Sequence, residues 1–286
     1  MQNDREKFST YRRSLLINIA ALSTLTTLPA LANSTSQINP PYTPQDSAIF
    51  SKRKNHAVGQ HIAILIYPQM VMLDMIGPQM VFNEAECNID LIWKDRAPIA
   101  TDLGIPITAT CTFDEYAIAP DVLLIPGGLM GGIACMNDPQ VLDFVQKKGA
   151  QASWVTSVCT GSLILAAAGL LKGYQATSHW GVKHLLPLMG AVLSDERVVI
   201  DRNRMTGGGV TAGIDFALLL LEKLQGRDIA ESVELLIEYA PAPPFNMGSL
   251  ELAGPEKMKI AMDKRKDIND IALKAVEIAR QRLGVL

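Results

Sequence analysis

The stretch "WVTSVCTGSLILAAAGLL", residues 154–171, changes its pattern at a single cysteine. Four of its first five residues are apolar or β-branched, which predicts a short buried strand. After Thr160, leucine and alanine recur at helical spacing and predict a helix that ends near Gly169. Cys159 is therefore expected on a strand-to-helix turn, the kind of turn that holds a hydrolase nucleophile out at the edge of a sheet.

Strand and helix patterns alternate along most of the remaining chain. Strands are predicted at 61–67, 89–93, 121–128, 175–180 and 197–203, an edge strand or hairpin at 104–113, and helices at 79–86, 138–148, 184–188, 212–224 and 229–239. This order predicts an α/β fold with a mostly parallel sheet and helices on both faces. Ligands of such sheets bind beyond the carboxyl ends of the strands. The loops after Tyr67 and Ile125 and the turn at Cys159 are expected to meet there.

The first 32 residues have the pattern of an export signal. Arg12 and Arg13 belong to a basic start, an apolar stretch follows at 15–28, and the small residues Ala30 and Ala32 precede an expected cleavage site. The arginine pair resembles a twin-arginine signal, so the chain is expected to be periplasmic or otherwise exported. The alternative is an uncleaved membrane anchor.

Composition limits the function classes that the chain can serve. The 286 residues are 48% hydrophobic and 19% charged, enough for a large core, and the net charge of −3 disfavours a nucleic-acid partner. No stretch after residue 32 is apolar enough to span a membrane. The expected organisation is a signal peptide at 1–32, a flexible linker at 33–57, a catalytic domain at 58–245 and a helical extension at 246–286. The extension could pack on its own domain or on a partner subunit.

The four cysteines have no metal-ligand spacing, so no metal site is predicted. Free thiols and disulfides both remain open for Cys87, Cys111 and Cys135. At the predicted turn, the N-terminus of the following helix would favour the thiolate of Cys159 and so a nucleophile. A buried, inert thiol is the competing interpretation, since free cysteine is often a core residue. Small residues after the sulfur, Thr160 and Gly161, would let a substrate approach.

Three other positions are candidates for the same site. Gly127 and Gly128 directly follow a buried strand, where glycines let the backbone approach a ligand and offer amides to an anion; a plain turn is the alternative. Asp74, in an apolar segment between the first strand and the first helix, could be a proton donor or acceptor, or a simple helix cap. His179 could pair with the cysteine as a base, or could only cap the sheet edge.

Together, "IPGG", "SVCTGSLILAAAGLL", "ATSHW" and "TGGGVTAGIDFALLLLE" resemble the DJ-1/PfpI superfamily over about residues 61–245. The stretches "MLDMIGP", "LIWKD" and "EYAPAPPF" are similar to its isonitrile hydratase branch. The resemblance implies a flavodoxin-like three-layer sandwich of the class I glutamine amidotransferase-like type, usually a homodimer, with no metal or organic cofactor. The loop expected after the glycine pair, at 129–136, differs from the family's usual one.

The resemblance also implies roles for individual residues. Cys159 would be the catalytic cysteine, Asp74 the essential acid and Thr160 the active-site threonine, with oxyanion amides from Gly128 and Thr160. A small isonitrile would be hydrated to an N-substituted formamide through a covalent thioimidate on the cysteine. A peptidase is disfavoured because no histidine follows Cys159. A small-molecule-binding or redox-sensing protein without catalysis is the alternative.

Overall fold

The computed structural model describes residues 59–285; the predicted signal peptide and the predicted linker lie outside this range. A seven-stranded sheet forms the centre of the described chain, with the strand order β10-β11-β7-β6-β1-β2-β5. All neighbouring strands are parallel except β10 and β11. The strands are β1 (His61–Leu65), β2 (Asn88–Trp93), β5 (Cys111–Thr112), β6 (Val122–Ile125), β7 (Trp154–Val158), β10 (Val198–Asp201) and β11 (Arg204–Gly207).

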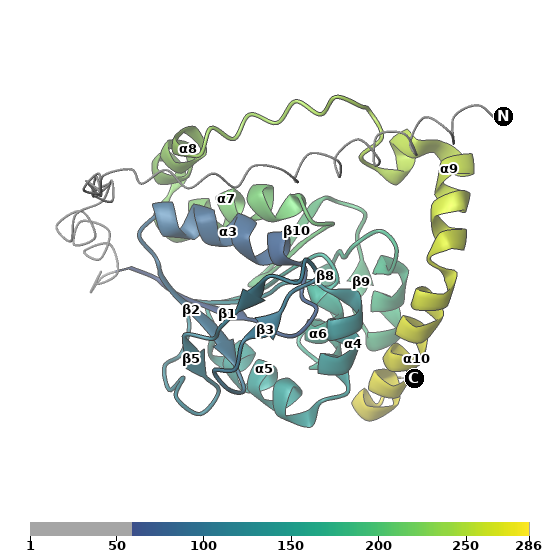
Figure 1. The fold of residues 1–286 in the computed structure, drawn as a ribbon, viewed down its shortest axis with the longest axis horizontal. Helices are drawn as coiled ribbons and strands as arrows, with labels where there is room; N and C mark the ends of the chain where they lie inside the picture. Colours follow the sequence, from purple (N-terminus) through teal and green to yellow (C-terminus); the bar gives the residue numbers. More distant parts are fainter. Residues whose placement is uncertain (1–58, 286) are drawn as a thin grey trace, which may run out of the picture. The chain divides into compact units, whose positions relative to one another are not determined.

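Helices cover both faces of this sheet, as Figure 1 shows. On one face α3 packs against α7 and α8; on the other, α4, α5 and α6 pack together, with η1 and α10 outside them. The predicted three-layer α/β sandwich with a mostly parallel sheet is therefore confirmed. The helices are α3 (Met72–Glu84), α4 (Leu129–Met136), α5 (Pro139–Gln151), α6 (Gly161–Ala167), η1 (Lys183–Met189), α7 (Ala212–Gln225), α8 (Arg227–Leu236), α9 (Leu250–Lys264) and α10 (Lys266–Leu283).

The central strands are buried on both sides, which explains their continuous apolar sequence. Every residue of β6 is buried, and four of the five in β1 and in β7. The strands β1, β6, β7 and β11 run parallel and end at the same edge, so the segments that follow them meet there. This edge holds the candidate site.

Helix α3 begins at Met72, seven residues before the predicted start. The helix continues through Gly77 and Pro78 and buries one face against α7. Asp102 stabilises its beginning, since its Oδ1 accepts a hydrogen bond of 2.9 Å from the Met72 N–H. Asp74 consequently lies in the first turn of a helix, not in the loop before one.

Three other segments differ from the prediction. Residues 129–136 form α4 rather than a loop, and the absent side chain of Gly131 lets this helix approach Pro68, whose oxygen would lie 2.0 Å from a Cβ. The strand predicted at 197–203 is the start of the antiparallel hairpin β10–β11, which turns at Arg202 with a φ of 55°. The strand predicted at 175–180 is reduced to β8 (Gln175–Ala176), which pairs with β9 (Val192–Leu193) in a small separate sheet.

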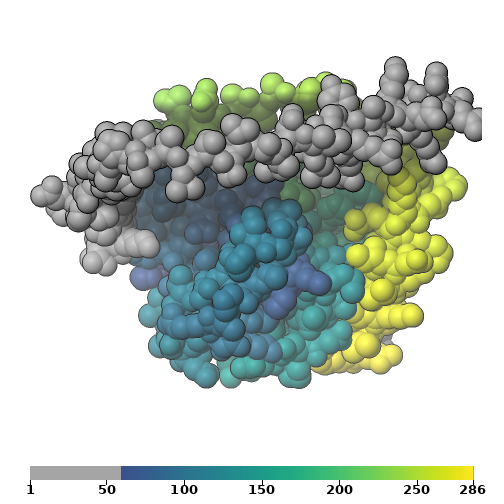
Figure 2. Space-filling model, viewed as in Figure 1, coloured from purple at the N-terminus to yellow at the C-terminus, as the bar shows by residue number. Residues whose placement is uncertain are grey.

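A second small sheet joins β3 (Ile99–Ala100) and β4 (Pro106–Ile107); only β4 lies in the segment 104–113 that was predicted as an edge strand or hairpin. The predicted C-terminal extension is helical and consists of α9 and α10, which form one side of the face seen in Figure 2. Helix α10 is anchored by small apolar residues, among them Ala272, Val276 and Ala279, whereas α9 buries none of its side chains. None of the helices between residues 59 and 285 is both long and apolar enough to cross a membrane.

Candidate active site

Cys159 lies between β7 and α6 in the left-handed backbone conformation, with a φ of 57°. Its N–H donates to the carbonyl oxygens of Gly207 (3.0 Å) and Gly208 (2.8 Å), and its own carbonyl accepts from Ser178 Oγ (3.0 Å). Left-handed backbone costs a residue with a side chain about 1–2 kcal/mol, so these bonds hold the turn in a strained form. The predicted strand-to-helix elbow is confirmed, and its side chain is only 3% exposed.

Asp74 is the acid beside this turn, and its side chain is completely buried. Its Oδ2 accepts a hydrogen bond of 2.9 Å from the Gly127 N–H, while Oδ1 has no hydrogen-bond partner within the described residues. Burial raises the pKa of the carboxyl from 3.8 to about 7, although the neighbouring Cys159 side chain and the Gly127 amide partly oppose the rise. Asp74 can therefore both accept and donate a proton near neutral pH.

Burial also raises the pKa of the Cys159 thiol, and the negative charge of Asp74 adds to the effect. Backbone amides of Thr160 and Val210 act in the opposite direction but are outweighed. The amide at the helix N-terminus therefore favours the thiolate, as predicted, but burial and the charge of Asp74 have the larger effect. The sulfur is held as a thiol, next to a carboxyl group that can take its proton.

The glycine pair shapes the other side of the site. A Cβ on Gly127 would lie 2.5 Å from Asp74 Oδ2 and 2.8 Å from Cys159 Cβ, so only glycine lets the three segments come together. Gly128, with a φ of 139°, donates its N–H to Thr160 Oγ1 at 2.9 Å. The amides of both glycines are thus already used within the protein, and the backbone N–H groups directed at the sulfur are those of Thr160 and Val210.

Gly161 and His179 lie at the edge of this arrangement. A Cβ on Gly161 would meet the carbonyl oxygen of Ile125 at 2.1 Å, so this glycine allows two backbone segments to approach rather than a substrate. His179 Nδ1 accepts from the Gly181 N–H at 3.1 Å. Burial and the nearby Arg265 lower the pKa of its imidazole to about 4, so the ring is neutral at pH 7. The acid–base partner beside the sulfur is Asp74.

Two residues of the site were missed in the sequence. Val210, just after β11, directs its amide at the sulfur; the signal was the glycine run 207–209 at the end of a parallel strand. Tyr67 is completely buried and donates from its hydroxyl to the Pro126 carbonyl at 2.8 Å. Burial, with the charges of Cys135, Asp74 and Cys159, raises its pKa well above the ordinary value. Its position at the end of the first strand could have indicated it.

The other thiols lie apart from this turn. All four cysteines of the described chain are free, so no disulfide is formed between any two of them. Burial raises the pKa of Cys135, in α4, to about 12 and that of Cys87 to about 11. Between residues 59 and 285 no three His, Cys, Asp or Glu side chains are grouped as ligands for a metal ion.

The sequence profile of the DJ-1/PfpI family matches residues 60–223, which include the turn, the acid and the glycine pair. The chain belongs to the DJ-1/PfpI family. Among curated DJ-1/PfpI relatives, the isonitrile hydratase of Pseudomonas putida is 48% identical over 193 residues, covering 67% of this chain and 84% of the relative. A THiJ/PfpI family protein from Pseudomonas syringae has a similar structure, with a TM-score of 0.74 and 41% identity over 76% of this chain and 90% of that one.

Drosophila melanogaster DJ-1beta has the same fold at 20% identity, with a TM-score of 0.60 over 64% of this chain and all of the other. The expected family and fold are thereby confirmed. Within this DJ-1/PfpI domain, a strained cysteine, a buried acid with a raised pKa and two amides aimed at the sulfur form one site. Such a site can add a thiol to a small electrophile and move the proton in the same step.

Proposed function

We propose that this chain hydrates a small isonitrile to an N-substituted formamide, with Cys159 as nucleophile and Asp74 as acid and base. The observation that carries the proposal is the buried pair itself: a thiol with a raised pKa beside a carboxyl whose pKa is raised to about 7. The 48% identity to an isonitrile hydratase supports the choice of substrate.

In the first step, the sulfur of Cys159 attacks the terminal carbon of R–N≡C. Asp74 takes the thiol proton and delivers it to the same carbon. A C–S and a C–H bond form, and one π bond of the C–N triple bond is lost, which leaves a C=N double bond. The product is the thioimidate R–N=CH–S–Cys159. The amides of Thr160 and Val210 stabilise negative charge at the sulfur while the proton is in transit.

In the second step, water adds across the C=N bond of the thioimidate. Asp74 accepts a proton from the water and passes it to the nitrogen, while the hydroxyl joins the carbon. The C–S bond then breaks as the hydroxyl proton passes through Asp74 to the sulfur. This releases R–NH–CHO and restores the thiol of Cys159, so each turnover consumes one isonitrile and one water.

The test is turnover of a panel of isonitriles by the purified chain, with methylglyoxal as an unrelated substrate. We expect formamide formation in the wild type, and a loss of about 10²–10⁴-fold in Asp74→Asn, the range that one general acid–base group supplies. Cys159→Ala should show no covalent adduct, whereas the wild type should gain the mass of one isonitrile on the peptide that contains Cys159. Full activity in either variant would contradict the assignment.

The alternative function is that of a redox sensor, and a related experiment distinguishes the two. Thiol oxidation needs the thiolate, and here burial and Asp74 both disfavour that form of Cys159. The raised pKa therefore supports acid–base chemistry over oxidation. Modification of Cys159 by dilute hydrogen peroxide without any hydration of isonitriles would favour the sensor.

A homodimer is part of the proposal. Its support, besides the family resemblance, is an apolar stripe on the outer side of α3 formed by Leu73, Ile76 and Met80, which are 38–51% exposed. Three large apolar side chains at helical spacing form a patch of the kind that is usually covered in assemblies. Sedimentation equilibrium of the wild type and of Met80→Glu tests it; two monomeric samples would contradict it.

Export through the predicted twin-arginine signal is also a proposal, since residues 1–32 lie outside the described part of the chain. Replacing Arg12 and Arg13 by lysine keeps the charge but removes the arginine pair. We expect the variant to remain in the cytoplasmic fraction while the wild type is found in the periplasmic fraction.

A further inference from the structure

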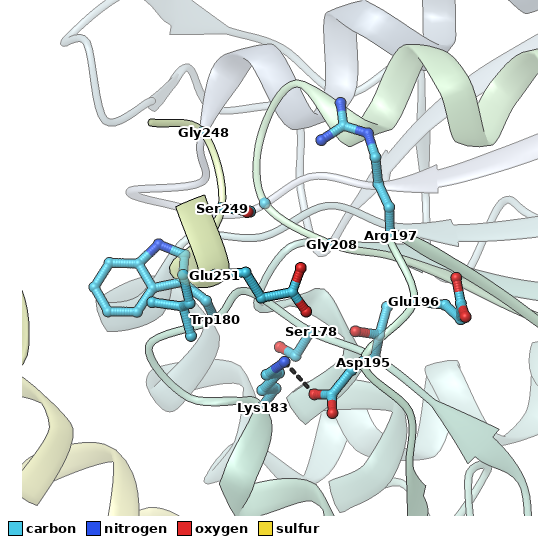
Figure 3. Close-up of a pocket in the computed structure, with 13 residues that line it drawn as sticks. Ser178, Trp180, Lys183, Asp195, Glu196, Arg197, Gly208, Gly248, Ser249 and Glu251 are labelled. Carbon is cyan, nitrogen blue, oxygen red and sulfur yellow. Dashed lines mark hydrogen bonds and ion pairs between the residues drawn. The ribbon is translucent and has the colours of Figure 1, made fainter. Parts of the chain in front are cut away.

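A pocket of about 380 Å³, shown in Figure 3, is lined in part by residues that are hydrogen-bonded to the Cys159 turn. Four segments line it: the turn 177–183, residues 195–197 just before β10, the loop 208–209 after β11, and residues 248–251 at the start of α9. The first three belong to the family domain, and the fourth belongs to the C-terminal extension.

The inner wall of this pocket is bonded directly to the nucleophile's backbone. Ser178 donates from its Oγ to the Cys159 carbonyl at 3.0 Å, and Gly208 accepts from the Cys159 N–H at 2.8 Å. Gly209, also in the wall, precedes Val210, whose amide acts on the sulfur. The inner wall of the pocket is therefore in direct contact with the backbone of the nucleophile.

The C-terminal extension builds the outer wall. Ser249 caps α9 by accepting the Leu252 N–H at 3.3 Å, and this cap holds the first turn of the helix, which carries Glu251 two residues after Ser249. At the junction of α9 and α10, the Arg265 guanidinium lies over the Trp180 ring, 5.6 Å from its centroid. The extension thus forms one wall of the pocket and, through Arg265, holds the Trp180 side chain of the wall formed by the turn 177–183.

The charges around the pocket do not cancel. Lys183 pairs with Asp195 at the rim, and Arg197 is bound to Asp215 outside the pocket at 2.6 Å. The carboxylates of Glu196 and Glu251, by contrast, have no ion pair or hydrogen bond in the part of the chain that the structure describes. Figure 3 shows Glu251 reaching from α9 into the pocket, between Trp180 and Asp195. A positively charged group bound there would meet unpaired negative charge.

We propose, on the basis of the hydratase function above, that this pocket receives the non-reacting end of the substrate. The C-terminal extension then selects substrates that carry an ammonium group, through Glu251 and through Trp180, whose ring is held by Arg265. The extension is then a specificity element rather than a simple cover for the domain. Its helix α9 buries no side chain of its own, so a structural role in the core does not account for it.

The first test compares two isonitriles of equal length, one ending in a primary amine and one in a methyl group. The wild type should prefer the amine in kcat/KM, and Glu251→Gln should reduce this preference about threefold through KM, the effect expected of one exposed charge pair. Glu256→Gln, on the same helix but outside the pocket, should keep the wild-type ratio.

The second test does not depend on hydration. Rates of Cys159 modification are measured by peptide mass spectrometry with methanethiosulfonates that carry an ammonium, a sulfonate or no charge, each divided by its rate with a small free thiol. We expect the ammonium reagent to react about tenfold faster than the sulfonate, and Glu251→Gln to reduce this ratio. Gly248→Trp should slow all three reagents by filling the pocket, since a Cβ there meets nothing within 4 Å; Leu252→Trp is the control for bulk.

The outcomes separate the two proposals. If no isonitrile is hydrated but the ammonium reagent is preferred and the preference depends on Glu251, the hydratase function fails and the pocket assignment stands. If isonitriles are hydrated with equal kcat/KM for both chain ends, or if Cys159 shows no charge preference or is reached by none of the reagents, the pocket assignment is overturned.

Discussion

Replacing Asp74 by asparagine should stabilise the folded protein at neutral and alkaline pH. The carboxyl is completely buried, and burial raises its pKa from 3.8 to about 7. Below pH 3.8 the group is protonated in both the folded and the unfolded chain. Between pH 3.8 and pH 7 the unfolded chain releases a proton that the folded protein keeps, so the free energy of unfolding falls as the pH rises. Asparagine cannot ionise and removes this dependence.

The size of the effect follows from the two pKa values of Asp74. Each pH unit between them corresponds to about 1.36 kcal/mol, so the carboxylate costs the folded protein up to about 4 kcal/mol above pH 7. At pH 4.5 the carboxyl of Asp74 in the unfolded chain is already ionised to a large part, so part of this cost is already present. The free energy of unfolding of Asp74→Asn, relative to the wild type, should therefore increase by about 3 kcal/mol between pH 4.5 and pH 8.

Urea unfolding followed by circular dichroism at several pH values measures this difference. The change of the difference with pH is the relevant quantity, because any cost of the amide's altered hydrogen bonding to Gly127 adds a constant. Asp114→Asn, at an exposed aspartate, serves as the control for the substitution itself. A difference for Asp74→Asn that stays within about 0.5 kcal/mol over this pH range would refute the reasoning that the buried carboxyl titrates near neutrality.

Three further outcomes follow from the same geometry. Gly127→Ala should fold but lose most of the activity, because its Cβ would lie 2.5 Å from Asp74 Oδ2; near wild-type kcat/KM would contradict the crowded arrangement. Iodoacetamide should alkylate Cys159 faster in Asp74→Asn than in the wild type at pH 8, because the carboxylate raises the pKa of the thiol; equal rates by peptide mapping would show that the two groups are not coupled. Arg282→Ala should lower the Tm, at a cost of about 1–3 kcal/mol, because its guanidinium donates to carbonyl oxygens at the ends of α4 and α6; an unchanged Tm would show that α10 needs no such anchor.

The parts of the fold that depend on local pattern could be predicted from the sequence. The elbow at Cys159 required only a β-branched run followed by helical spacing, and the cap of α5 by Asp138 required only an Asp-Pro pair. The start of α3 could not be predicted in this way. Its first N–H is bonded to Asp102, thirty residues away, so the helix begins where a distant side chain allows it to.

The members of the site were predictable where they follow strand ends and not where they depend on packing. Asp74, Gly127 and Cys159 each lie near the carboxyl edge of the sheet, and the structure brings them into contact. The contribution of Val210 depends on the hairpin β10–β11, of which the sequence pattern predicted only the strand at 197–203. Such a turn leaves little pattern, because its residues are fixed by cross-strand bonds rather than by periodicity.

The predicted effect of the helix N-terminus on the sulfur is outweighed by burial and by Asp74, and the reason bears on the chemistry. A helix N-terminus supplies about 0.3–1 kcal/mol to a nearby anion, whereas taking a thiolate out of water and placing it beside Asp74 costs more, so the thiol of Cys159 prevails. A preformed thiolate suits reactions that expel a leaving group. Addition to an isonitrile instead needs a sulfur and a proton on the same carbon. A thiol beside a carboxyl of pKa about 7 holds both, so the burial that weakens Cys159 as a free nucleophile supplies the proton that the proposed hydration requires.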